Sequence, residues 1–180
     1  MREGTGEERE TKVLLVGVDT GEEPDFEHSM EELSSLSEAA GKKVVGIIVQ
    51  RMEAVNKALY IGTGKVAEVK EYAGMIEADE VVFDNALSPS QIRNLGNELE
   101  LPILDRTNLI LDIFAIRART GEAKLQVETA RLQYMLPRLV GMRDNLSRQG
   151  GTGGSMSNKG AGETKLELDR RKIEHRISEL

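Results

Sequence analysis

The sequence of 180 residues contains no cysteine, no tryptophan and only two histidines. The absence of cysteine excludes disulfides and thiolate metal sites, which fits a reducing compartment. His28 and His175 both lie in helix-like segments, which leaves little material for a histidine-based triad or a multi-histidine metal site. Aromatic residues make up 3% of the chain, so the core must be built mostly from leucine, isoleucine, valine and alanine.

Long apolar runs are also missing. No stretch approaches the ~20 residues that a membrane-spanning helix needs. The segment 1–12 is too charged for a signal peptide. We therefore expect a cytoplasmic protein without a membrane span.

Charge is unevenly distributed along the chain. Residues 1–107 carry 11 Lys and Arg against 22 Asp and Glu, a net charge of −11, whereas residues 108–180 carry 13 against 9, a net charge of +4. The two parts sum to the −7 of the whole chain. A basic C-terminal third behind an acidic body indicates a polyanionic partner, although a plain pair of helices with solvated lysine and arginine would show the same balance.

Apolar runs of strand length alternate with amphipathic segments of helix length in the first part of the chain. The runs are continuous, as in strands buried on both faces, and the alternation predicts βαβ units with a mainly parallel sheet. Ser88, Pro89 and Gln91 mark a helix start, with a capping box and a proline at the first helical position. The predicted strands are 13–18, 44–49, 80–84 and 102–105, and the predicted helices are 27–40, 64–77 and 88–100.

Beyond the last predicted strand, helical periodicity takes over. One long helix is predicted over 108–140, with Gly121 as a weak point and Pro137 as a residue that kinks or ends its last turns. A second helix begins at the capping box of Thr164 and Glu167. Its apolar stripe is unfinished at the chain end, which predicts a longer parent chain. One apolar stripe per helix indicates an antiparallel pair.

The predicted fold class is therefore α/β, a small, mainly parallel, four-stranded α/β subdomain followed by a long antiparallel two-helix coiled hairpin. The predicted parts are a disordered tail (1–11), the α/β subdomain (12–107) and the hairpin (108–180), with a glycine-rich tip loop over 147–163. Within this loop, six of the 13 residues from Gly150 to Gly162 are glycine.

A phosphate-binding loop requires G-x-x-x-x-G-K-[ST] between a strand and a helix, and the chain has no such pattern. The nearest approach is Gly62-Thr63-Gly64-Lys65, where Gly62, Gly64 and Lys65 form at most a weak anion-binding site at a helix N-terminus. A tight turn with an exposed lysine is the favoured alternative.

Three aspartates, Asp19, Asp84 and Asp105, follow or end predicted strands, at the edge where open α/β sheets bind ligands. Three carboxylates at one edge can hold a metal ion, but aspartate is also a common turn and cap residue. We favour the structural role, and predict neither a metal site nor catalytic residues in this chain.

The tip of the predicted hairpin is rich in groups that bind phosphate. Over 131–159 there are five arginines and lysines and a single acid, Asp144. Glycine lets a backbone approach phosphates and arginine supplies forked donors, whereas the low aromatic content argues against base stacking. A plain linker is the alternative. The predicted RNA-binding residues are Arg138, Arg143, Arg148, Gln149, Gly150, Gly151, Asn158, Lys159 and Gly160.

Several long motifs resemble the HflX family of translational GTPases, in the same order along the chain. They are YIGTGKVAE (60–68), LSPSQIRNL (87–95), DRTNLILDIFAIRARTGEAKLQVETARLQYMLPRL (105–139) and GAGETKLELDRRKIEHRI (160–177). The tip loop departs from the family pattern GGIGTRGPGET. It is longer, has Ala161 where proline is usual, and has Lys159 near the usual arginine.

The resemblance implies an N-terminal α/β subdomain, a two-helix subdomain and a following G domain that is absent from this chain. GTP and Mg are the cofactors of that G domain, and none is implied for this chain. The family binds the large ribosomal subunit, with the hairpin tip reaching towards the peptidyl-transferase region, and helps to split stalled or idle ribosomes. ATP binding and RNA unwinding have also been attributed to its N-terminal regions.

We therefore expect an N-terminal ribosome-binding and rRNA-binding domain that is not by itself an enzyme. Its expected partners are the large ribosomal subunit, the rRNA of that subunit and its own C-terminal G domain. The alternative is a domain that binds ATP or GTP, or one that regulates the GTPase activity of the missing G domain.

Overall fold

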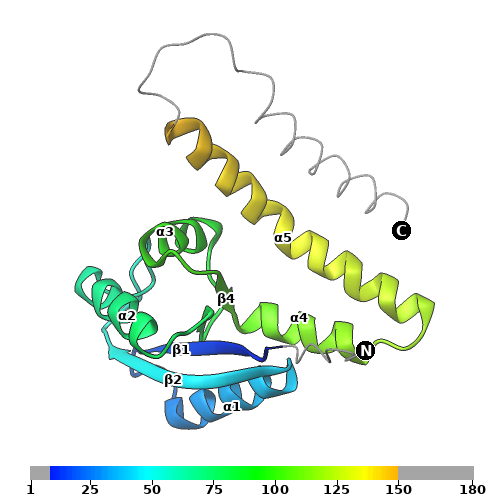
Figure 1. Ribbon diagram of the computed structural model, residues 1–180, viewed down its shortest axis with the longest axis horizontal. Helices are drawn as coiled ribbons and strands as arrows, with labels where there is room; N and C mark the ends of the chain where they lie inside the picture. Colours follow the sequence, from blue (N-terminus) through cyan, green and yellow to red (C-terminus); the bar gives the residue numbers. More distant parts are fainter. Residues whose placement is uncertain (1–8, 150–180) are drawn as a thin grey trace, which may run out of the picture.

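The body of the protein is a parallel sheet covered by helices, seen in a computed structural model that describes residues 9–149, with side chains up to Arg138 (Figure 1). The strands are β1 (Thr11–Asp19), β2 (Lys42–Arg51), β3 (Glu80–Phe83) and β4 (Ile103–Asp105), and the helices are α1 (Phe26–Ala39), α2 (Thr63–Met75), α3 (Pro89–Leu99), α4 (Arg106–Arg117) and α5 (Gly121–Gln149). The four strands lie in the order β2-β1-β3-β4, and every neighbouring pair is parallel. This confirms the predicted parallel α/β fold.

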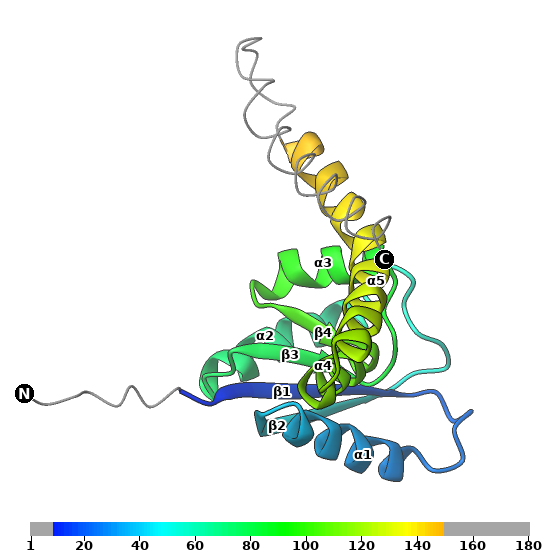
Figure 2. The same ribbon diagram turned by 90° about the vertical axis from the view of Figure 1, so that its right-hand side faces the viewer.

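Helices cover both faces of the sheet, with α1 and α4 packed on one face and α2 and α3 on the other. Figure 2 shows α1 on the opposite side of β1 and β2 from α2 and α3. Alternate side chains of the central strand β1 point into two separate cores. Val13 and Leu15 lie in the core formed with α1 and with Leu109 of α4. Leu14 and Val16 lie in the core formed with α2 and α3. Both faces of β1 are buried, which explains its uninterrupted apolar run.

Two glycines allow helices to approach the sheet closely. A Cβ atom on Gly17 of β1 would lie 2.5 Å from Sδ of Met30 in α1. A Cβ atom on Gly46 of β2 would lie 2.8 Å from Cδ1 of Ile76, just after α2. A side chain at either strand position would require these neighbouring side chains to move, so glycine serves here for close approach.

The predicted capping box at the start of α3 is confirmed. The Ser88 side chain accepts a hydrogen bond from the Gln91 N–H, and the Gln91 side chain accepts one from the Ser88 N–H. Pro89 occupies the first turn, as expected for a residue that lacks a donor there.

The prediction of one long helix over 108–140 is wrong, because α4 ends at Arg117 and α5 begins at Gly121. Ala118 takes an extended conformation, with φ −69° and ψ 115°, and breaks the helix. Thr120 then caps the new helix, because its Oγ1 accepts a hydrogen bond of 3.0 Å from the N–H of Ala123. Pro137 lies inside α5 and does not end it.

The break places the two helices in different surroundings. Leu109 and Ile113 of α4 are buried, and α4 packs against α1 and the sheet. In contrast, α5 lies against α3 and α4 (Figure 1). The predicted returning helix of the hairpin, from Thr164 onwards, lies outside the described residues. No helix within residues 9–149 is both long enough and apolar enough to cross a membrane.

Candidate functional site

The three aspartates at the carboxyl edge of the sheet each have partners within the protein. Asp19 accepts a hydrogen bond of 3.0 Å from the N–H of Gly21, which makes it a turn residue. Asp84 and Asp105 are buried and accept hydrogen bonds from several elements. In the part of the chain that the structure describes, no group of three acidic or histidine side chains is placed to hold a metal ion.

Asp84 lies at the point between β1 and β3 where the direction of strand connection reverses. In open α/β sheets this point forms the crevice that binds ligands. Here Tyr60, from the segment between β2 and α2, fills it. The Tyr60 hydroxyl donates a hydrogen bond of 2.7 Å to Oδ1 of Asp84, and its ring packs edge-to-face on Phe83 with centroids 5.8 Å apart. The protein's own side chains therefore occupy the crevice.

The Tyr60 contact has electrostatic and conformational signatures. Burial raises the pKa of Asp84, while the hydrogen bonds from Tyr60 and from the N–H of Val18 oppose that rise. Burial, together with the Asp84 carboxylate, also raises the pKa of Tyr60, so its hydroxyl remains a donor. Tyr60 has a φ of 64°, an unusual value for a bulky side chain, and the surrounding contacts hold it there.

The Gly62-Thr63-Gly64-Lys65 turn does begin a helix, because Gly62 is the N-cap of α2. Its groups are already engaged, however. The Gly62 N–H donates a hydrogen bond of 2.9 Å to the Gln50 side chain, and Lys65 Nζ lies 3.0 Å from a carboxylate oxygen of Glu68. Gly64 has open space around its Cα. This geometry gives the predicted anion site no support beyond the helix N-terminus itself.

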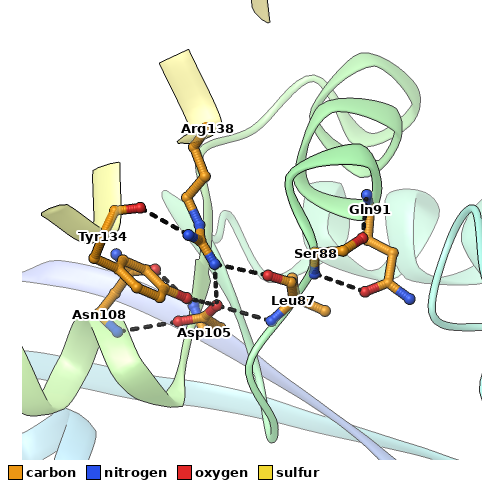
Figure 3. A network of polar contacts seen from close by, with 7 residues as sticks. All are labelled: Leu87, Ser88, Gln91, Asp105, Asn108, Tyr134 and Arg138. Atoms are coloured by element: carbon orange, nitrogen blue, oxygen red, sulfur yellow. Dashed lines mark hydrogen bonds and ion pairs between the residues drawn. The ribbon is translucent and has the colours of Figure 1, made fainter. Parts of the chain in front are cut away.

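Asp105 connects β4 to three helices through its carboxylate (Figure 3). Its Oδ1 accepts a hydrogen bond of 3.0 Å from the N–H of Asn108, which caps α4. Its Oδ2 accepts one of 2.9 Å from the N–H of Leu87, just before α3, and another from the hydroxyl of Tyr134 in α5. Burial and the Asp105 contact raise the pKa of Tyr134, which keeps that hydroxyl protonated as a donor.

Arg138 completes this connection one helical turn beyond Tyr134. Its Nη1 donates to the Tyr134 carbonyl and its Nη2 to the Leu87 carbonyl, both over 2.7 Å. The guanidinium carbon lies 3.4 Å from the centroid of the Tyr134 ring, and Nη2 lies 3.8 Å from Oδ2 of Asp105. We call this group, Asp105, Tyr134, Arg138 and the Leu87 backbone, the arm anchor. It ties α5 to the body at the edge of the sheet.

Arg106 makes a second connection at this edge, between α4 and α1. Its Nε donates a hydrogen bond of 2.7 Å to the carbonyl of Asp84. Its Nη2 donates to the carbonyl and to the hydroxyl of Ser29, and its Nη1 lies 3.2 Å from Oε1 of Glu32. One guanidinium therefore joins three elements of the body.

Of the predicted RNA-binding residues, Arg138 alone has a described side chain, and it is engaged with groups of the protein itself. This placement gives its predicted RNA contact no support. Arg143, Arg148 and Gln149 lie on the last turns of α5, without described side chains. Gly150, Gly151, Asn158, Lys159 and Gly160 lie outside the described residues.

Sequence reasoning missed Tyr134 and Arg106 and the joining role of Asp105. One local signal was available, because Asp105 and Asn108 form a capping box of their own. Tyr134 and Arg138 are four residues apart, which places them on one helix face, but the same spacing suits a plain solvent-exposed pair. The hydrogen bond between Tyr134 and Asp105 joins residues 29 positions apart in the sequence, and no local sequence pattern predicts it.

Two family models match the chain, one after the other. The model described as GTP-binding GTPase N-terminal matches residues 27–115, and the one described as GTP-binding GTPase Middle Region matches residues 117–180. The border between the two matches falls at the end of α4.

Curated relatives are similar over nearly the whole chain. GTPase HflX of Alkalihalophilus pseudofirmus is 50% identical over 169 residues, which cover 93% of this chain and 39% of the relative. GTPase HflX of Escherichia coli is 41% identical over 169 residues, which cover 94% of this chain and 39% of the relative. The chain thus spans about two fifths of the length of these relatives.

Solved structures share the fold. The crystal structure of the complex of SsGBP and GDP has a TM-score of 0.62 at 27% identity, over 94% of this chain and 43% of that chain. A GTP-binding protein from the archaeon Sulfolobus solfataricus, also in complex with GDP, has a TM-score of 0.58 at 24% identity, over 94% of this chain and 45% of that one. In both cases more than half of the solved chain lies outside the match.

Proposed function

The chain belongs to the HflX family of GTPases as an N-terminal region, and from this premise we propose that it binds the rRNA of the large ribosomal subunit. In this proposal α5 carries the glycine-rich segment 150–162 to the RNA, and the parent GTPase uses the contact to split or rescue ribosomes. The body positions α5, and the chain performs no catalysis of its own.

The observation that carries the proposal is a long helix fixed to the body partway along its length. The 29 residues of α5 span about 43 Å at ~1.5 Å per residue. The arm anchor holds this helix at Tyr134 and Arg138, and the helix then continues to Gln149, directly before the glycine-rich segment. Arg143 and Arg148 lie on this last part against a single acid, Asp144, which suits contact with phosphate.

The alternatives have less support. A nucleotide site at Gly62, Gly64 and Lys65 would have to displace the partners that Gly62 and Lys65 already have. The crevice at the carboxyl edge is filled by Tyr60. A regulatory action on the GTPase's own G domain remains a prediction, and it is compatible with RNA binding by α5.

Co-sedimentation with purified large ribosomal subunits tests the proposal. We expect the 180-residue chain to sediment with the subunits, and a variant lacking residues 150–162 to stay in the supernatant. A circular dichroism melt of both proteins serves as the control, since the deletion lies outside the body and should leave unfolding of the sheet unchanged. Equal sedimentation of the two proteins would show that the segment is not the recognition element. Failure of both to sediment would overturn binding by this chain.

A further inference from the structure

The carboxylate of Asp105 does more than cap a helix. Capping α4 requires only Oδ1, which accepts from the N–H of Asn108. The second oxygen accepts from two other elements, from the N–H of Leu87 before α3 and from the hydroxyl of Tyr134 in α5. An ionised carboxylate has about four acceptor positions, so one fully buried group can serve all three bonds.

Both backbone polar groups of Leu87 are bound by side chains of the arm anchor. Its N–H donates to Asp105, and its carbonyl accepts from Arg138. The guanidinium of Arg138 also lies 3.8 Å from Asp105, where its charge offsets that of the buried carboxylate. Because the same two residues also contact Tyr134, the position of α5 is coupled to the loop that begins α3.

The other end of α5 is joined to the body by a short exposed turn. Residues 118–120 connect α4 to α5, and Arg119 and Thr120 are both exposed. Tyr134 lies 14 residues after Thr120, or about 21 Å along the helix at ~1.5 Å per residue. The turn fixes one point of α5, and the arm anchor fixes a second. Two points determine the direction of the helix segment between them, residues 121–134. Between them, Nη2 of Arg131 lies 3.2 Å from Oδ1 of Asp112 in α4, a partly exposed pair that contributes little.

We propose that Asp105, Tyr134 and Arg138 form a polar lock that sets the direction of α5 relative to the sheet, and that α5 swings about the turn 118–120 when the lock is broken. The inference deepens the proposed function, on which it rests, by assigning the residues that aim the tip at its RNA target. In this role Arg138 is a positioning residue and makes no contact with phosphate.

Distance measurements on labelled protein test the lock without any ribosome. Because the chain has no cysteine, Glu71→Cys on the exposed side of α2 and Ser147→Cys on α5 create a unique pair of spin-label sites. Pulsed electron paramagnetic resonance should give one narrow distance distribution for this pair. We expect Tyr134→Phe to broaden the distribution, and Tyr134→Phe combined with Arg138→Met to broaden and shift it further.

The matched control is Thr129→Val, which also removes a hydroxyl from α5. Its Oγ1 donates to the Leu125 carbonyl of the same helix, so the distance distribution should stay narrow. These variants leave Asp105 itself in place, so the body should fold, and circular dichroism should confirm that it does. A distribution in the double variant equal to that of the parent would overturn the lock.

Ribosome binding separates the lock from a direct RNA contact. The lock holds α5 in its binding orientation before it meets the ribosome, so less conformational entropy is lost on binding. Loss of a lock residue should therefore weaken binding by roughly 2- to 10-fold. The slope of log affinity against log salt should stay unchanged for Arg138→Met, because no phosphate contact is lost. A slope reduced by about 0.9 would instead make Arg138 a phosphate contact and overturn its positioning role. If the parent chain fails to sediment with ribosomes, the proposed function fails, while the distance measurement still decides the lock.

Discussion

Asp84 and Tyr60 show how one side chain can close a site that the fold would otherwise leave open. The carboxylate is buried, and burial raises its pKa, so the folded state carries a charge in an unfavourable place. The Tyr60 hydroxyl and the N–H of Val18 offset part of that cost by donating to it. Tyr60 holds its ring in the crevice with a strained backbone φ, which the surrounding contacts maintain.

Replacing Tyr60 with Phe should therefore produce a pH-dependent loss of stability. Loss of the hydroxyl removes a bond that lowers the pKa of Asp84, so this pKa should rise further. At pH 7 we expect a free energy of unfolding lower by about 1–3 kcal/mol, typical for a lost hydrogen bond to a charged group. Thermal melts of the parent and the variant at pH 7 and at lower pH measure the difference.

The direction of the pH effect follows from the raised pKa. A carboxyl that binds its proton more tightly in the folded state adds stability below its unfolded pKa of about 3.9, and this contribution is lost as the pH rises through the folded pKa. The difference in free energy of unfolding between the parent and Tyr60→Phe should thus shrink on acidification. Protonated Asp84 carries no charge, so the hydrogen bond from Tyr60 stabilises it less. A difference that is constant or that grows at low pH would contradict this account. In Asp84→Asn, this site should contribute no pH dependence to the free energy of unfolding.

At the level of the elements, close contact between strand and helix depends on glycine. In Gly17→Ala, the new Cβ would press on the side chain of Met30, which is buried against β1. We expect a cost of about 1–3 kcal/mol in the free energy of unfolding, as for other overpacked cores. Urea denaturation monitored by circular dichroism provides the measurement.

Gly74→Ala is the matched control for this prediction. Gly74 lies within α2, and nothing lies within 4 Å of a Cβ built there. Alanine at such a helical position should leave stability unchanged or raise it by up to ~1 kcal/mol. Equal effects of the two substitutions would show that close packing at Gly17 makes no contribution to the free energy of unfolding.

The elements also show which parts of the fold were predictable. The strands and the capping box of Ser88 and Gln91 follow from apolar runs and cap residues, which are local signals. The break between α4 and α5 was missed because apolar side chains continue at helical spacing across it. The deciding features were the Thr120 cap and the burial of Leu109 against the sheet, and burial is a tertiary effect. The arm anchor was missed for the same reason, since its partners are far apart in sequence.

On the scale of the whole molecule, the sequence divides into an acidic part, residues 1–107 with a net charge of −11, and a basic part, residues 108–180 with a net charge of +4. Under the proposed function, this distribution would favour contact of the basic part with RNA, while the acidic part would repel polyanions. Replacing Arg148 and Lys159 together with alanine should weaken binding to the large ribosomal subunit and reduce the salt slope by up to about 2, since each lost phosphate contact contributes about 0.9. Sedimentation over a series of salt concentrations gives the slope. An unchanged slope would exclude these two residues as main contacts.

The strand order β2-β1-β3-β4 has a consequence for synthesis of the chain. Of the four described strands, β1 is made first and is central, and β2, β3 and β4 each find their partner already made when they emerge. No strand of this sheet has to wait for a later one. At ~5–20 residues per second, synthesis from Thr11 to Asp105 takes roughly 5–20 s, which is long compared with the folding of small α/β domains. The body should therefore grow outward from β1 on the translating ribosome. When α5 emerges, its partners Asp105 and Leu87 should already be in place.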